Sequence, residues 1–246
     1  MANPFPPDLF DRSVASIERA YVQLGHRIGW RFLTGPRATL SPSTAIGFLT
    51  LNPGGDTEPA DHPRASSEAG SAYLIETWQG SAQGAAPLQL QVQALFGSLA
   101  RHLGEEGSLS TFMNQRVMSA HFIPFRSPRF ADLRRRSESV TFARTLWREI
   151  LTHWAPRILL TIDTEAFKNL LAVLLQQAGV RHGDRQRFDT GWGAYQAEAA
   201  RLVIPGNDDG LTLARLPHLS TFKLFSRTAC TPFLERFLAY LAGPVP

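Results

Sequence analysis

Short apolar segments and longer segments of helical periodicity follow one another along this chain. Nearly continuous apolar runs are typical of strands buried on both faces of a parallel sheet, and they occur at residues 45–51, 116–123, 157–162 and 211–216. Apolar residues at helical spacing predict helices near residues 14–28, 88–103, 137–154, 164–178 and 232–241. One more strand, over residues 194–204, is expected at a sheet edge or in an excursion from the sheet.

Strands separated by helices predict one three-layer α/β domain that spans residues 1–246. Its centre is expected to be a mainly parallel, four-stranded sheet. In such sheets ligands bind beyond the carboxyl ends of the strands. The loops to inspect are therefore residues 52–56, 121–128 and 217–223.

Composition and charge narrow the class of protein. The chain has 246 residues, of which 43% are hydrophobic, yet no apolar run is long enough to cross a membrane. A single cysteine, Cys230, fits a reducing compartment, and the first residues lack the pattern of a secretion signal. We therefore expect a cytoplasmic protein. Its net charge of +4 is a mild lean towards polyanions such as DNA.

The sequence lacks the motifs of several classes of enzyme. The seven histidines lack the spacing of a zinc site, and a nucleophile elbow, a phosphate-binding P-loop and a dinucleotide fingerprint are all missing. We therefore expect no metal and no cofactor.

Two strand ends carry the remaining signal. The first predicted strand runs Gly47-Phe48-Leu49-Thr50-Leu51 into Asn52-Pro53-Gly54, and the last one ends in Pro217-His218-Leu219-Ser220. Taken singly, the first is ordinary turn chemistry and the second an ordinary surface histidine. Taken together, in this order and on this strand pattern, they resemble the motifs of the uracil-DNA glycosylase superfamily. The first motif is similar to that of the mismatch-specific and single-strand-selective branches.

The resemblance implies a DNA glycosylase that flips a nucleotide and cuts the base from its sugar without metal or cofactor. Asn52 would hold the attacking water and His218 would donate a hydrogen bond to the departing base. The flipped nucleotide would contact Leu51, Pro53, Gly54, Gly55, His121, Phe122 and a stacking aromatic, for which Tyr73 is the first candidate and Trp78 the second. DNA phosphates would meet Arg126, Ser220, Thr221, Lys223 and Arg227.

The sequence departs from the family pattern at two positions. His121 stands where the family has an asparagine that reads the uracil edge, and a neutral histidine offers only one donor or one acceptor. Leu219 stands where the family's second motif has proline. These departures favour an alternative, a catalytically inactive protein that keeps the fold and binds nucleic acid or nucleotides. A third possibility is a glycosidase of small nucleosides.

Overall fold

A computed structural model describes residues 5–78, 80–105, 107–205 and 207–243, with no side-chain description at 207–209. The other positions of the expected 1–246 domain lie outside the described residues. The helices are α1 (Leu9–Gln23), α2 (Ala72–Ile75), α3 (Pro87–His102), α4 (Leu109–Gln115), α5 (Arg136–His153), α6 (Thr164–Leu175), α7 (Leu219–Phe222) and α8 (Thr231–Ala242). The strands are β1 (Ile46–Thr50), β2 (Val117–His121), β3 (Ile158–Thr161), β4 (Arg181–Asp189), β5 (Gln196–Ile204) and β6 (Asn207–Arg215).

The strands form one six-stranded mixed sheet in the order β2-β1-β3-β6-β5-β4. The first four strands in this order are parallel, whereas β5 and β4 pair antiparallel. The expected four-stranded sheet is therefore wrong in strand number, although each of its strands is present. The strand expected near 194–204 is β5, and it lies inside the sheet rather than at its edge.

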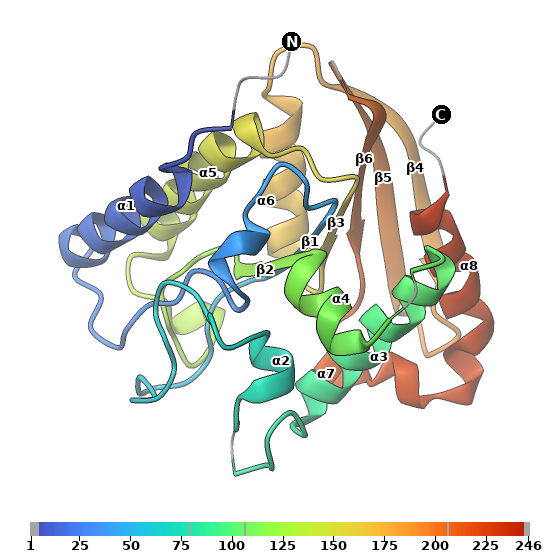
Figure 1. The fold of residues 1–246 in the computed structure, drawn as a ribbon, viewed down its shortest axis with the longest axis horizontal. Helices are drawn as coiled ribbons and strands as arrows, with labels where there is room; N and C mark the ends of the chain where they lie inside the picture. The colour runs from blue at the N-terminus through green and yellow to red at the C-terminus, as the bar shows by residue number, and fades with distance from the viewer. Residues whose placement is uncertain (1–4, 79, 106, 206, 244–246) are drawn as a thin grey trace.

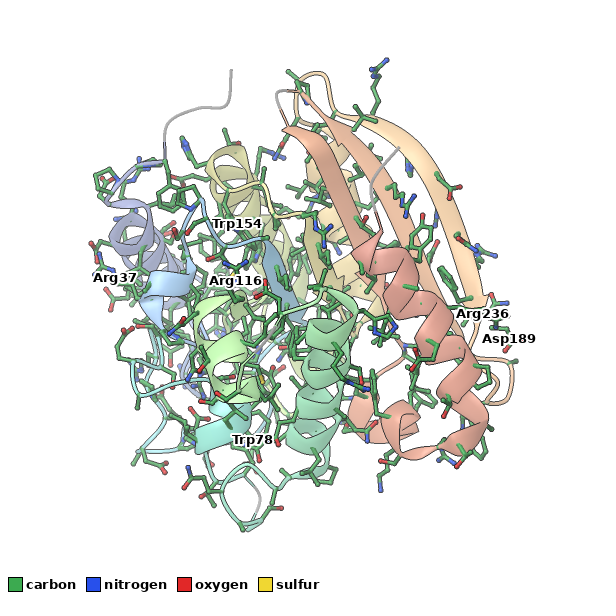
Figure 2. The ribbon with its side chains drawn as sticks, turned by 45° about the vertical axis from the view of Figure 1, so that its right-hand side comes forward. Arg37, Trp78, Arg116, Trp154, Asp189 and Arg236 are labelled. Carbon is green, nitrogen blue, oxygen red and sulfur yellow. The ribbon has the colours of Figure 1, made fainter. Side chains whose placement is uncertain are left out.

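The sheet is flanked by helices (Figure 1). One face packs against α1, α5 and α6, and the opposite face packs against α3, α4 and α8, with a separate apolar core on each side. All five residues of β1 are buried, as a strand covered on both faces requires. Figure 2 shows Trp154 inside the fold, where its indole nitrogen donates to the Thr44 carbonyl at 2.8 Å.

A short extended segment, residues 30–34, runs antiparallel beside β2. The backbone nitrogen of His121 donates to the Phe32 carbonyl, and that of Thr34 donates to the Ser119 carbonyl. The helix predicted over residues 14–28 ends at Gln23, which leaves the chain free to reach this position. The segment places Arg31 beside the end of β2.

None of the helices in the described part of the chain is long and apolar enough to cross a membrane.

Candidate functional site

The parallel register brings the motif residues to one edge of the sheet. Thr50 of β1 lies opposite His121 of β2, and Leu49 of β1 lies opposite Thr161 of β3, which in turn pairs with Arg215 of β6. Neighbouring strands lie about 4.8 Å apart. Because β3 separates β1 from β6, the loops that begin at Asn52 and His218 leave the sheet about 10 Å from one another.

Asn52 is held by its amide nitrogen. This nitrogen donates to the Ser127 hydroxyl at 2.9 Å, to the Pro53 carbonyl at 3.0 Å and, more weakly, to the Phe125 carbonyl at 3.5 Å. The Ser127 hydroxyl donates its own proton to the Arg129 carbonyl, so it can only accept from Asn52. This network fixes the orientation of the amide. The Asn52 Oδ1 atom has no hydrogen-bond partner among the described residues and is available as an acceptor.

His121 is enclosed by protein on most sides but keeps part of its surface open. Its Nδ1 lies 2.7 Å from the Thr50 hydroxyl. Burial lowers the pKa of His121 well below its ordinary value, and the charges of Arg31 and Arg126 lower it further. The ring is therefore neutral at neutral pH, with Nε2 as the atom left to meet a ligand.

A buried charge cluster beside His121 centres on Arg31 and Glu76, which the sequence-based prediction does not name. The Arg31 guanidinium donates to both carboxylate oxygens of Glu76, at 2.8 Å through one nitrogen and at a shorter distance through the other. Trp78 Nε1 donates to the same carboxylate at 2.8 Å, and His62 Nε2 lies 3.6 Å from it. Burial raises the pKa of Glu76, but the hydrogen bonds and charge of Arg31 outweigh it and leave that pKa lowered.

Arg126 is the second buried cation of this cluster. It is 8% exposed and donates to the Gly54 carbonyl, so it supports the 52–55 loop from within. This placement differs from the surface phosphate contact predicted for it. Burial lowers the pKa of Arg126, and the nearby charge of Arg31 lowers it further. The Nε atoms of both arginines are buried without a hydrogen-bond partner among the described residues.

The aromatic residues predicted to touch the base lie in the core. Tyr73 is 1% exposed and packs edge-on against Phe48, while Phe122 is fully buried. Burial raises the pKa of Tyr73 to about 12. Neither ring presents a face to solvent, which does not fit an open stacking surface. Trp78, the second candidate, is half-buried against Tyr73.

The remaining predicted contacts of the base lie around Asn52. Leu51 is half-buried and Pro53 is buried, whereas Gly54 and Gly55 are exposed at the tip of the loop. Gly55 has a φ of +98°, a conformation that favours glycine. The space where a Gly54 side chain would stand is empty to 4 Å, so the backbone at this position is open to close approach.

His218 lines a cavity of about 460 Å³ at the ends of β3 and β6. The Ser220 hydroxyl lies 2.9 Å from its Nδ1. Burial lowers the pKa of His218, although the negative charge of Asp163 opposes this shift. Asp163, Tyr195, Gln196, Arg215 and Phe222 also line the cavity, whereas Asn52 and His121 do not. His218 is thus a neutral hydrogen-bonding group at the same edge as Asn52, but not in one cavity with it.

The other predicted phosphate contacts follow His218 in the chain. Thr221 and Lys223 are exposed, and Ser220 is tied to His218. Arg227 folds back onto the protein, because its Nε donates to the Phe222 carbonyl at 2.8 Å and its guanidinium covers the ring of Trp192.

Sequence reasoning missed Ser127, Arg31, Glu76 and Trp192. Only Ser127 carries a local signal, since it follows Arg126 directly in a predicted site loop.

In the described part of the chain, no group of three or more histidine, cysteine, aspartate or glutamate side chains could hold a metal ion. No protein-family model matches this sequence, and no curated protein matches it.

Proposed function

We propose that this protein is a monofunctional DNA glycosylase that removes uracil or a related deaminated or damaged base. The observation that carries the proposal is the fixed amide of Asn52, whose acceptor oxygen faces away from its three protein contacts at the edge that also holds His218. The order of the parallel strands, which brings Asn52 and His218 to the same edge of the sheet, supports a uracil-DNA glycosylase-like fold. The buried free thiol of Cys230 supports action in the reducing cytoplasm.

In the proposed reaction, Asn52 Oδ1 accepts a hydrogen bond from water as the water oxygen attacks C1′ of the flipped nucleotide. The bond from C1′ to the base nitrogen breaks, and the base takes the electron pair and leaves as an anion. The proton lost by the water goes to solvent, from which the base is protonated. No lysine lies in the motifs to form a Schiff base with the sugar.

Neutral His218 stabilises the developing negative charge. In the proposed reaction the Ser220 hydroxyl, 2.9 Å from Nδ1, donates to it. The ring proton then lies on Nε2, which donates to an oxygen of the departing base. A donor aimed at developing charge is worth about 3–4 kcal/mol in other enzymes. The positive potential of Arg31 and Arg126 beside His121 acts in the same direction.

The test measures base release from oligonucleotides, single- and double-stranded, that carry uracil, hypoxanthine, xanthine or hydroxymethyluracil, with strand cleavage in alkali as the readout. We expect Asn52→Ala and His218→Ala each to slow release by about 100-fold or more. Asn169→Ala on α6 and His182→Ala on β4 are the matched controls and should retain the wild-type rate. Release that is equally fast in Asn52→Ala would overturn the proposal.

His121 favours a second candidate function, the binding of nucleic acid or nucleotides without catalysis, because its single free nitrogen cannot make the paired contacts of an asparagine. Tight DNA binding together with no release from any of the four bases would favour this candidate.

A further inference from the structure

Two exposed aromatic side chains stand on one turn beside the His218 cavity. Among the described residues, the exposed large hydrophobic side chains are Val22, Leu90, Leu175, Trp192 and Tyr195. The aliphatic members are scattered, as is usual on a protein surface. The aromatic members, Trp192 at 40% exposure and Tyr195 at 47%, both lie in the turn that connects β4 to β5. Figure 2 places Asp189, where this turn begins, on the outer side of the molecule.

The turn is firmly held. The Thr190 hydroxyl donates to the Tyr195 carbonyl at 2.7 Å, and the Gly191 nitrogen donates to Asp189 Oδ1 at 3.0 Å. Gly191 has a φ of +73°, and a Cβ there would lie 2.7 Å from the Ala229 carbonyl oxygen, so the turn docks closely on its neighbour. The exposure of the two rings is therefore a built feature of the fold.

Contacts tie both rings to the segment that carries His218. The Arg227 guanidinium lies 3.7 Å from the centre of the Trp192 ring. The rings of Tyr195 and Phe222 have centres 4.2 Å apart at an interplanar angle of 47°. Tyr195, Phe222 and His218 line the same cavity. We call Trp192, Tyr195, Phe222 and Arg227 the aromatic platform.

The chemistry of the aromatic platform matches an unpaired nucleobase with its phosphate. Aromatic rings and an arginine plane stack on any base. At the cavity wall, Asp163 uses Oδ1 to cap α6, and its other oxygen has no partner among the described residues; the Gln196 amide also lines the cavity. These groups suit the polar edge of a base. Lys223 is exposed and does not line the cavity, and its charge suits a backbone phosphate.

We propose that the aromatic platform binds a base of single-stranded DNA next to the flipped nucleotide, by stacking on Tyr195 and Trp192. The identity of the ligand as DNA rests on the proposed function. The platform itself rests on the geometry of the turn and of the cavity.

The test uses undamaged single-stranded DNA of about ten nucleotides, within the range of such sites. Quenching of tryptophan fluorescence reports binding. Trp30, Trp147 and Trp154 are at most 3% exposed, and the Trp192→Ala variant separates the signal of Trp192 from that of the half-buried Trp78. We expect quenching by the oligonucleotide and much weaker binding of an abasic backbone of equal length. By anisotropy of a labelled oligonucleotide, Tyr195→Ala and Trp192→Ala should each weaken binding about 5- to 100-fold.

Leu90→Ala, which removes an exposed apolar side chain on α3, is the control and should bind like the wild type. Equal binding of the normal and abasic strands, or wild-type binding by Tyr195→Ala, overturns the proposal. Tighter binding of RNA of the same sequence overturns the assignment to DNA. Base release is measured in parallel. Stacking without base release would support the aromatic platform and refute the glycosylase. Base release that is unaffected by Tyr195→Ala would support the glycosylase and refute the platform.

Discussion

Replacement of Glu76 by alanine should strongly destabilise the protein. The Arg31 side chain is 4% exposed and that of Glu76 is 8% exposed, and they meet through two hydrogen bonds. Without Glu76 the guanidinium stays buried beside Arg126, and Trp78 loses the acceptor of its indole proton. Removing one partner of a buried pair typically costs about 3–5 kcal/mol, because the other charge is left uncompensated. We expect a loss of that size in the free energy of unfolding.

Urea unfolding followed by circular dichroism measures this loss. Asp11→Ala is the control, because Asp11 and Arg37 form an exposed pair at 2.8 Å whose loss should cost less than about 1 kcal/mol. The double variant Arg31→Met with Glu76→Leu should be more stable than Glu76→Ala, since it leaves no unpaired charge. A cost below about 1 kcal/mol for Glu76→Ala, at an unchanged urea dependence, would refute this reasoning.

The Arg31–Glu76 pair also predicts that the free energy of unfolding falls at acid pH. The folded-state pKa of Glu76 lies below its ordinary value of 4.5. The carboxylate therefore contributes its full stabilisation above about pH 4.5, and this is lost as the pH falls through the folded-state pKa. In Glu76→Gln, unfolding measured over this range should lose that part of its pH dependence.

Further predictions concern two glycines and two histidines. Gly47→Ala should cost about 1–3 kcal/mol in urea unfolding, or more, because its Cβ would lie 2.5 Å from the Trp154 ring. Gly54→Ala has open space and should leave stability unchanged while slowing base release; full activity would contradict close approach of DNA. His26, whose pKa burial and Arg134 lower from 6.5 to about 4, should cost up to about 3 kcal/mol of stability as the pH falls from 6.5 to 4, and a His26→Gln variant should flatten this dependence. His121→Asn should raise the rate on uracil relative to the other bases, and an unchanged ratio would refute a base-reading role.

The parallel strands of the sheet could be predicted because strands that are buried on both faces have nearly continuous apolar sequences. Ile46 to Thr50 are all buried, so every position of β1 is apolar, glycine or threonine. The sequence of β4 has no such apolar run. In the described part of the chain no strand neighbours the outer edge of β4, and nearly all its side chains are exposed. The sequence from Arg181 to Arg187 is accordingly polar and shows no alternation.

Some residues of the candidate site could likewise be predicted from the sequence, and others could not. Asn52 and His218 could be found because they directly follow predicted strands, and the parallel register then brings them to one edge. Arg31 could not be predicted as a site residue, because an arginine is ordinarily exposed. Its burial depends on Glu76, which lies 45 residues further along the chain. Tyr73, the first candidate for a stacking aromatic, lies in the core. The buried Gln89 side chain fixes α2 by donating to the Ala72 and Glu76 carbonyls, both at 2.8 Å.

The electrostatics of the edge bear on the role of His121. A proton on this ring would add a third positive charge beside Arg31 and Arg126, with Glu76 as the carboxylate already paired to Arg31. His121 therefore acts as a neutral group, which offers one hydrogen bond through Nε2 and carries no charge of its own. The positive potential at this point comes from the two arginines, whose charges do not change near neutral pH. A negatively charged group is thus favoured beside His121. In the proposed glycosylase reaction, this is the property that the departure of the base as an anion requires.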